Sequence, residues 1–217
     1  MGVFGPIWED HARKIADNWD SVVADSDVTL VAGDTSWAMR LADAAPDLEY
    51  LAERPGRKIV IRGNHDYWWK REDTRRTQGL VHPSITLLQG RPLVVGSVGI
   101  TGTRGWSLDE REDDRTPEQN LRIFNRELSY LRTGLERLPL GLDLKIAALH
   151  YPPFDADLQP NEFFRLLIEF EVDILVYGHI HRTTTAWREG DVEGVRCYLV
   201  AVDNTGFAPR LIVPGRP

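Results

Sequence analysis

Four of the six histidines in this chain stand just after short apolar runs, where each run ends. The runs followed by polar or glycine residues are Val28–Ala32, Lys58–Arg62, Leu144–Leu149 and Asp173–Tyr177. Short β-branched runs bounded by glycine are typical of buried strands. In open α/β sheets, ligands bind at the carboxyl ends of the strands. The pattern therefore predicts that six polar residues converge at one edge of the fold, namely Asp34, Asn64, His65, His150, His179 and His181.

The segments between these runs carry apolar residues at helical spacing or helix-start signals. They predict helices over Ile7–Val23, Ser36–Glu53 with Ser36 as the cap, Pro117–Leu138 and Asn161–Phe170. Further strands are expected at Ile85–Gln89, Leu93–Val95, Val98–Thr101, Val195–Val202 and Arg210–Val213, and a charged exposed loop at Ser107–Thr116. Helix–strand alternation followed by mixed short strands indicates an α/β sandwich of mixed sheets.

Composition narrows the class of protein. The chain has 217 residues, 42% of them hydrophobic, which suits one soluble globular domain. The net charge of −7 argues against a broad grip on nucleic acid or an anionic membrane. The single cysteine, Cys197, excludes an internal disulfide and favours a reducing compartment. With no membrane-length apolar run and no signal-peptide pattern, we expect a cytoplasmic protein without a membrane partner. Nothing in the sequence indicates an oligomeric state.

The polar motifs carry more weight together than apart. Taken alone, Gly-Asp and Gly-Asn-His after a strand usually form turns, and a lone histidine there is more often hydrogen-bonded than metal-bound. A Gly-His-x-His such as Gly178–His181 arises by chance in about one chain of this composition in a hundred. Its occurrence beside Gly-Asn-His, which is of similar rarity, favours a metal site. Imidazole, carboxylate and amide oxygen suit Mn, Fe or Zn without distinguishing among them.

These motifs resemble the calcineurin-like metallophosphoesterase superfamily. Its pattern runs Asp-x-His, Gly-Asp, Gly-Asn-His-(Asp/Glu), a lone His and Gly-His-x-His. The last four blocks occur here in order as Gly33-Asp34, Gly63–Asp66, His150 and Gly178–His181. Four flanking segments are similar to those of a bacterial subgroup of predicted phosphohydrolases. They are Val3–Pro6, Gly33–Arg40, Asp66–Trp69 and Gly102–Trp106. The resemblance implies an α-β-β-α sandwich of two mixed sheets, with residues 1–217 forming a single metallophosphoesterase domain.

The resemblance also implies a role for each matching residue. Two divalent metal ions would be bridged by Asp34. The second ion would be completed by three further ligands, Asn64, His150 and His179. The first ion would be held by His181. His65 would bind no metal but would contact the substrate phosphoryl group or protonate the leaving oxygen.

For two further residues, two roles each are open. Arg104 either adds a charge-assisted contact to phosphate or is an exposed loop cation. Asp66 either orients His65 or caps the following helix, and we favour the cap.

One block of the pattern is absent, because no Asp-x-His occurs upstream of Asp34. Glu9 and His11 mimic its spacing, but residues two apart on a helix diverge by about 200°. The first metal would then keep only Asp34 and His181. We expect a nearly complete second site, a depleted first site and a sandwich without its first strand. Either the sequence is shortened at its N-terminus or the motif is truly lost, leaving a mononuclear or inactive protein.

The function expected is metal-dependent hydrolysis of a phosphoester by a metal-activated water. Two ions about 3.5–4 Å apart stabilise the attacking and leaving oxygens in such enzymes. The alternative is a catalytically impaired or inactive scaffold that keeps the fold and binds a protein partner. A nucleic-acid-binding module is disfavoured by the charge, and the sequence does not separate monoester from diester substrates.

Overall fold

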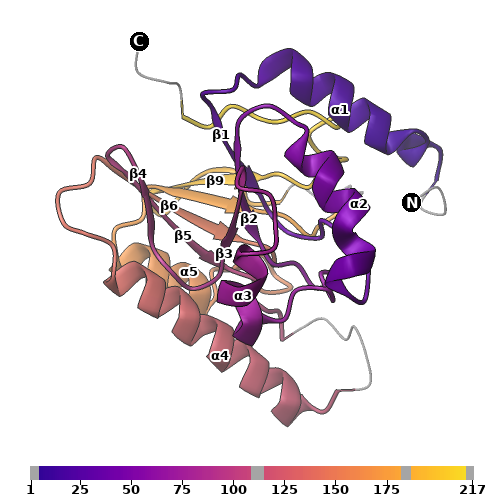
Figure 1. The fold of residues 1–217 in the computed structure, drawn as a ribbon. Coiled ribbons are helices and arrows are strands. Elements are labelled where there is room, and N and C mark those ends of the chain that lie inside the picture. The colour runs from indigo at the N-terminus through magenta and orange to yellow at the C-terminus, as the bar shows by residue number, and fades with distance from the viewer. Residues whose placement is uncertain (1–4, 109–114, 182–186, 214–217) are drawn as a thin grey trace.

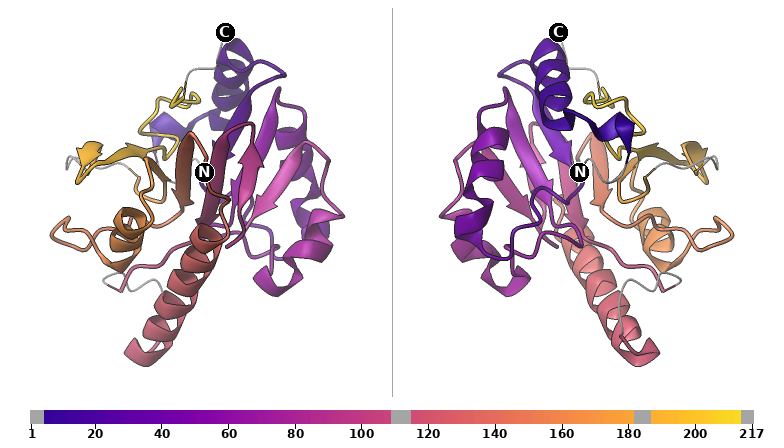
Figure 2. Two further views of the ribbon diagram at one scale, coloured as in Figure 1. Left: turned by 90° about the vertical axis from the view of Figure 1, so that its left-hand side faces the viewer. Right: turned by 90° about the vertical axis from the view of Figure 1, so that its right-hand side faces the viewer.

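Two β-sheets lie face to face between layers of helices (Figures 1 and 2). The structure is a computed structural model and describes residues 5–108, 115–181 and 187–213. One sheet has three strands in the order β1-β2-β3, and the other has six in the order β4-β5-β6-β7-β9-β8. This is the α/β sandwich that the sequence predicts.

The smaller sheet is wholly parallel in the part of the chain that the structure describes. Its strands are β1 (Val28–Val31), β2 (Arg57–Ile61) and β3 (Ile85–Leu88). Helix α2 (Leu41–Ala52) connects the first pair, while η3 (Arg71–Asp73) and α3 (Thr74–Gln78) connect the second. Crossover connections of this kind give parallel neighbours. The expected mixture of directions therefore belongs to the larger sheet.

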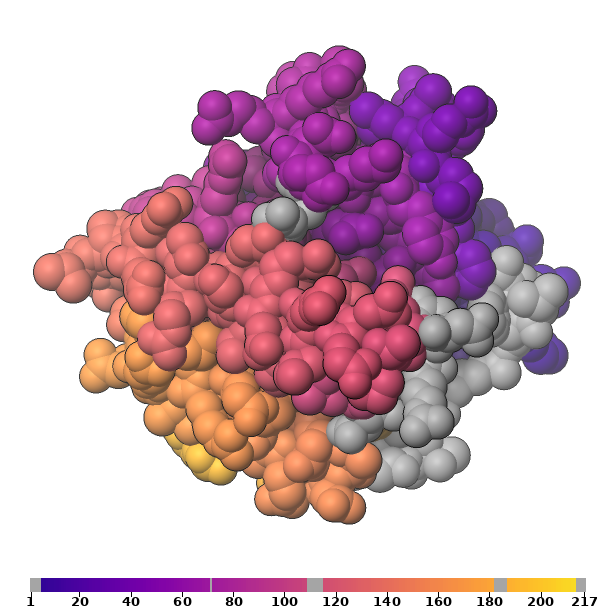
Figure 3. Space-filling model, turned by 90° about the horizontal axis from the view of Figure 1, so that it is seen from below, coloured from indigo at the N-terminus to yellow at the C-terminus, as the bar shows by residue number. Residues whose placement is uncertain are grey.

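The larger sheet has a parallel centre and antiparallel edges. Its centre consists of β5 (Val98–Thr103), β6 (Leu144–Leu149), β7 (Ile174–Tyr177) and β9 (Val195–Leu199). The edge strands are β4 (Leu93–Val95) and β8 (Gly190–Val192). Helices α4 (Pro117–Glu136) and α5 (Glu162–Glu169) lie between β5 and β6 and between β6 and β7 in the chain. Viewed from below, α4 crosses the middle of the face (Figure 3).

Alternation along the strands divides the apolar core into three layers. Helices α1 (His11–Val22) and α2 cover the outer face of the smaller sheet through residues such as Trp19, Leu48 and Val60. The two sheets meet through Ile59, Ile61, Ile146 and Val176. The outer face of the larger sheet packs against α4 and α5 through Leu131, Leu149, Phe164 and Tyr177. The sheets are thus buried on both faces, which explains their continuous apolar runs.

Several expected boundaries were wrong. The N-terminal segment forms η2 (Pro6–Trp8) before α1, because Asp10 adopts a left-handed φ of 52° that interrupts the helix. Ser36 does not cap α2, which begins at Leu41; its hydroxyl instead donates to Asp47.

Other differences concern the C-terminal third and one loop. Residues Arg210–Val213 form no strand, and the short edge strand β8 was not anticipated. Of the expected loop at Ser107–Thr116, residues 109–114 lie outside the described residues. Among the helices that the structure does describe, none is both long and apolar enough to cross a bilayer.

Candidate metal centre

The six predicted residues all lie in loops at the carboxyl ends of strands. Asp34 follows β1, Asn64 and His65 follow β2, His150 follows β6, and the pair His179 and His181 follows β7. Contacts between these loops show that the two sheets present their carboxyl ends to the same place. The His150 ring nitrogen Nδ1 lies 2.7 Å from the carbonyl oxygen of Ala32, and this contact joins the larger sheet to the smaller.

A buried carboxylate, Asp66, ties the two loops of the smaller sheet together. It is 0% exposed and accepts hydrogen bonds from the backbone N–H groups of Gly63, Asp34, Thr35 and Ser36, at 2.7–3.1 Å, and from the Thr35 hydroxyl and Trp68 indole. Asp66 therefore sets the loops after β1 and β2 against each other. The expected role as a helix cap was wrong, because the next helical turn, η3, begins only at Arg71.

Close packing between these loops requires glycine at one position. A Cβ on Gly63 would lie 2.0 Å from Asp34 Oδ1 and 2.4 Å from the Asp34 nitrogen. Both contacts are shorter than atoms tolerate, so any larger residue would push Asp34 away from β2. The glycine of the Gly-Asn-His motif is thus explained by the approach of the neighbouring carboxylate.

His150 has an unusual hydrogen-bonding environment. Its Nδ1 lies 2.7 Å from the Ala32 oxygen and its Nε2 lies 2.6 Å from Asn64 Oδ1. Burial is the main cause that lowers the pKa of His150 to about 3, so the ring is neutral and carries one proton. One of the two oxygens therefore faces a nitrogen lone pair. A cation between Nε2 and Oδ1 would turn that repulsion into two ligand bonds.

Two more donor atoms surround the same nitrogen. His179 Nδ1 lies 3.2 Å from His150 Nε2, and Asp34 Oδ2 lies 3.6 Å from it. Both residues hold positive φ angles, 57° for Asp34 and 69° for His179, which direct their side chains out of the strand ends. Such backbone angles are uncommon outside glycine and often occur at functional sites.

Opposing influences act on the carboxyl group of Asp34, and burial is the largest, so its pKa is raised overall. Burial raises the pKa of its carboxyl group, while the backbone N–H of His65, which donates to Oδ1 at 2.9 Å, lowers it. The imidazoles of His65, His179 and His181 act in the same direction as that hydrogen bond. A divalent cation would favour the charged carboxylate far more strongly. The donor set of one carboxylate, one amide oxygen and two imidazoles fits Mn, Fe or Zn.

The cluster is looser than a finished metal site. Within the described residues, no group of three or more His, Cys, Asp or Glu side chains is already arranged to hold a metal ion. The amide of Asn64, which belongs to none of these types, supplies the shortest contact to His150. The geometry thus shows that donor atoms converge, without showing a bound cation.

His181 lies in a different environment. Its side chain is 45% exposed, and its Nδ1 lies 2.8 Å from Oδ1 of Asp203, whose side chain is 2% exposed. The Trp8 ring packs edge-on against His181, with ring centroids 5.5 Å apart. His11, which mimics part of the absent motif, has its Nδ1 3.1 Å from the Trp8 carbonyl oxygen.

Sequence reasoning missed Asp203, although a signal for it exists. The residue follows the apolar run Val195–Val202, just as the predicted site residues follow theirs. The strand-end rule that identified Asp34 therefore applies equally to Asp203.

Arg104 is buried rather than exposed, with a relative exposure of 6%, so its interpretation as an exposed loop cation was wrong. Its guanidinium lies 3.7 Å from Glu127 Oε1 on α4 and 4.5 Å above the Trp106 ring. Burial lowers the pKa of Arg104, and Glu127 partly restores it. The backbone oxygen of Arg104 accepts the N–H groups of His150 and Tyr151, at 3.2 and 2.9 Å. Contact with a phosphate remains a prediction.

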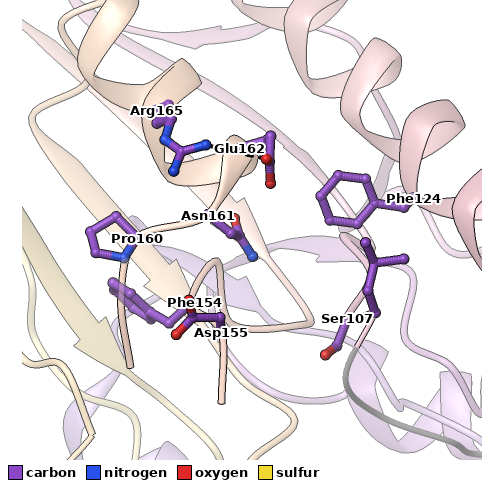
Figure 4. Close-up of a pocket in the computed structure, with 9 residues that line it drawn as sticks. Ser107, Phe124, Phe154, Asp155, Pro160, Asn161, Glu162 and Arg165 are labelled. Atoms are coloured by element: carbon purple, nitrogen blue, oxygen red, sulfur yellow. Dashed lines mark hydrogen bonds and ion pairs between the residues drawn. The ribbon is translucent and has the colours of Figure 1, made fainter. Parts of the chain in front are cut away.

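Two cavities lie away from this cluster. A cavity of about 210 Å³ between α4, α5 and the loop before α5 is lined by Phe124, Phe154, Asn161 and Arg165, among others (Figure 4). A second, of about 250 Å³, is lined by Glu72, Gln89, Arg91 and Arg137, among others. Neither contains any of the six predicted residues. The candidate site is therefore a loop cluster at the strand ends.

Comparisons with known proteins agree with the motif pattern. A family model described as calcineurin-like phosphoesterase matches residues 7–183. The gene 66 protein of Mycobacterium phage L5 is 40% identical over 58 residues, which are 27% of this chain and 28% of the phage protein.

Two solved structures are also similar. A protein of unknown function from Aquifex aeolicus has a TM-score of 0.45 at 15% identity, covering 92% of this chain and 80% of its own. A protein of Thermus thermophilus has a TM-score of 0.49 at 17% identity, covering 80% of this chain and 77% of its own.

Proposed function

Because this chain belongs to the calcineurin-like phosphoesterase family, we propose that it hydrolyses a phosphoester with a divalent cation held by Asp34, Asn64, His150 and His179. The observation that carries the proposal is the contact between His150 Nε2 and Asn64 Oδ1 at 2.6 Å. A neutral imidazole has one proton for the two oxygens that face its nitrogens, Ala32 O at 2.7 Å and Asn64 Oδ1 at 2.6 Å. With that proton on Nδ1, a cation between Nε2 and Oδ1 would bind both atoms.

Each residue of the chain has a stated task in this proposal. A divalent cation, when bound, polarises phosphoryl oxygens and lowers the pKa of water. Asp34 extends toward the first metal position, where His181 is the other ligand. His65 faces the phosphoryl group and gives a proton to the leaving oxygen. Arg104 lies beneath the His150 loop, where it holds the backbone N–H groups and adds positive charge near the phosphate.

The two metal positions are unequal in this proposal. The second position draws on the loops after four strands, two from each sheet, while the first has only Asp34 and His181 as ligands. We propose that the second is the tighter site and that the first fills only at higher metal concentration. Mn, Fe and Zn are the candidate ions, and phosphomonoesters and phosphodiesters are both candidate substrates.

The experiment strips the protein of metal, adds back Mn²⁺ and measures hydrolysis of p-nitrophenyl phosphate and bis(p-nitrophenyl) phosphate. We expect Mn²⁺-dependent turnover of at least one substrate and its loss in His179→Ala. The matched control is His82→Ala, since His82 is an exposed histidine that contacts Ser84 and lies before β3, at the amino end of a sheet whose carboxyl end carries the site loops. Absence of both stoichiometric metal and turnover would contradict the proposal and favour the scaffold alternative.

A further inference from the structure

His65 is clamped between two aromatic side chains. The Trp37 ring stacks on its imidazole with centroids 4.2 Å apart and planes 24° apart. The Tyr67 hydroxyl lies 3.0 Å from His65 Nδ1, and the Tyr67 ring meets the imidazole edge-on at 5.8 Å. Stacking fixes the ring plane, and the hydroxyl contact fixes the rotation within that plane.

Both aromatic residues are placed by the same carboxylate. Trp37 directly follows the Asp34–Ser36 segment whose N–H groups donate to Asp66, and Tyr67 directly follows Asp66 itself. The clamp is therefore built on the backbone that sets the metal-site loops. Its geometry relative to Asp34 is fixed by hydrogen bonds of 2.8–3.1 Å from the segment to Asp66.

The clamp leaves aromatic surface exposed to solvent. Trp37 is 47% exposed and Tyr67 is 42% exposed, whereas the adjacent Trp68 and Trp69 are 5% and 0% exposed. Trp68 and Trp69 pack into the core on the outer face of the smaller sheet, so these two tryptophans serve packing. The exposed pair contributes less to the core, and both of its rings contact His65.

The second ring nitrogen of His65, Nε2, is available to a substrate. Within the described residues, Nδ1 faces Tyr67 and the backbone N–H donates to Asp34, while Nε2 takes part in no hydrogen bond. We infer that Trp37 and Tyr67 are positioning residues for the proposed hydrolysis, holding His65 so that Nε2 faces the leaving oxygen. The inference rests on the proposed function for its chemistry and on the clamp geometry for its structure.

The proton transfer can be written in full. The Nε2–H bond of His65 breaks and an O–H bond forms on the leaving oxygen, as the bond from phosphorus to that oxygen breaks and its electron pair stays with oxygen. A new bond forms between phosphorus and the attacking water oxygen, and that water loses one proton to the solvent. His65 starts the step with a proton on both ring nitrogens and ends it with the Nδ1 proton alone. Nδ1–H donates to the Tyr67 oxygen before and after the transfer. Tyr67 thereby keeps Nε2 as the nitrogen that exchanges the proton.

The kinetic test compares two aryl phosphates. Phenol is a poorer leaving group than 2,4-dinitrophenol and depends on protonation of the leaving oxygen. General-acid catalysis contributes about 10²–10⁴-fold, so misplacing the acid should cost about 10-fold or more on phenyl phosphate. We expect Tyr67→Phe and Trp37→Leu each to slow phenyl phosphate about 10-fold, and to change 2,4-dinitrophenyl phosphate less than about twofold. Trp37→Phe keeps a stacking ring and should restore most of the rate.

The structural test needs neither metal nor turnover. Nitrogen-15 NMR of histidine-labelled, metal-free protein reports which ring nitrogen of His65 carries the proton. We expect Nδ1–H in the wild type and a mixture of both tautomers in Tyr67→Phe. The control is Tyr198→Phe, which removes a tyrosine hydroxyl from β9 and should leave His65 and both rates unchanged.

The possible failures can be told apart. Equal loss on both substrates in Tyr67→Phe, or an unchanged His65 tautomer, would overturn the clamp while the hydrolase proposal stands. A wild type that hydrolyses neither these monoesters nor bis(p-nitrophenyl) phosphate would remove the proposed function. The clamp would then be supported by the tautomer change alone and overturned by its absence.

Discussion

The candidate site has two unlike halves. The buried half, Asp34 with Asn64, His150 and His179, gathers donor atoms within 2.6–3.6 Å of one imidazole nitrogen. The open half has His181, which is 45% exposed and contacts Asp203. Ligands fixed before binding lose less conformational freedom when the metal arrives. The contrast teaches that the fold gathers the donor atoms of the proposed second position and leaves His181, at the proposed first position, apart from them.

The largest expected effect comes from removing the carboxylate beneath the buried half. Asp66→Ala leaves four backbone N–H groups and an indole without their acceptor, so we expect the free energy of unfolding to fall by about 3–5 kcal/mol. Urea denaturation measures it. Asp155→Ala, on the loop before α5, is the control and should cost far less. An equal loss in both variants would show that Asp66 has no special role.

The next largest expected effect is the pH dependence of stability, which should come from the buried half and not from the open half. Burial lowers the pKa of His150 to about 3 in the folded metal-free protein. In the unfolded chain His150 takes up a proton near its ordinary pKa of about 6.5, so acid favours the unfolded chain. This contribution to stability is complete at a pH above that pKa and declines as the pH falls toward 3. We expect a loss of about 2 kcal/mol by pH 5, largely absent in His150→Gln and retained in His181→Gln. If the free energy of unfolding fell equally with pH in both variants, His150 would not be the group responsible.

The smallest effect concerns the open half. A metal-binding histidine is usually oriented by a hydrogen bond from its other nitrogen to a carboxylate. Asp203→Asn should therefore weaken the second equivalent of Mn²⁺ about 10-fold and leave the first unchanged, as isothermal titration calorimetry would show. Weakening of the first equivalent instead would mean that Asp203 serves the buried half.

The sequence predicted the residues that the structure brings together at the strand ends, and their chemical roles stay predictions. Strand-end placement identified Asp34 and His150 because both follow apolar runs that form strands. The same rule applies to Asp203, which follows the run Val195–Val202 but belongs to none of the four motif blocks. The family's layered fold also followed from the order of helical and strand patterns.

The remaining features depend on tertiary contacts that leave no pattern in the sequence. Asp66 accepts N–H groups from a segment about thirty residues earlier, and every residue but proline offers such a donor. Arg104 resembles an ordinary loop cation until α4 brings Glu127 against it. The edge strand β8 is only three residues long, too short for alternation to show.

The most direct test of the unequal halves is a calorimetric titration of metal-stripped protein with Mn²⁺, repeated for His179→Ala and His181→Ala. We predict one tight equivalent in the wild type, weakened about 100-fold by His179→Ala and less than about threefold by His181→Ala. Equal weakening by the two variants, or no tight equivalent in the wild type, would contradict the account.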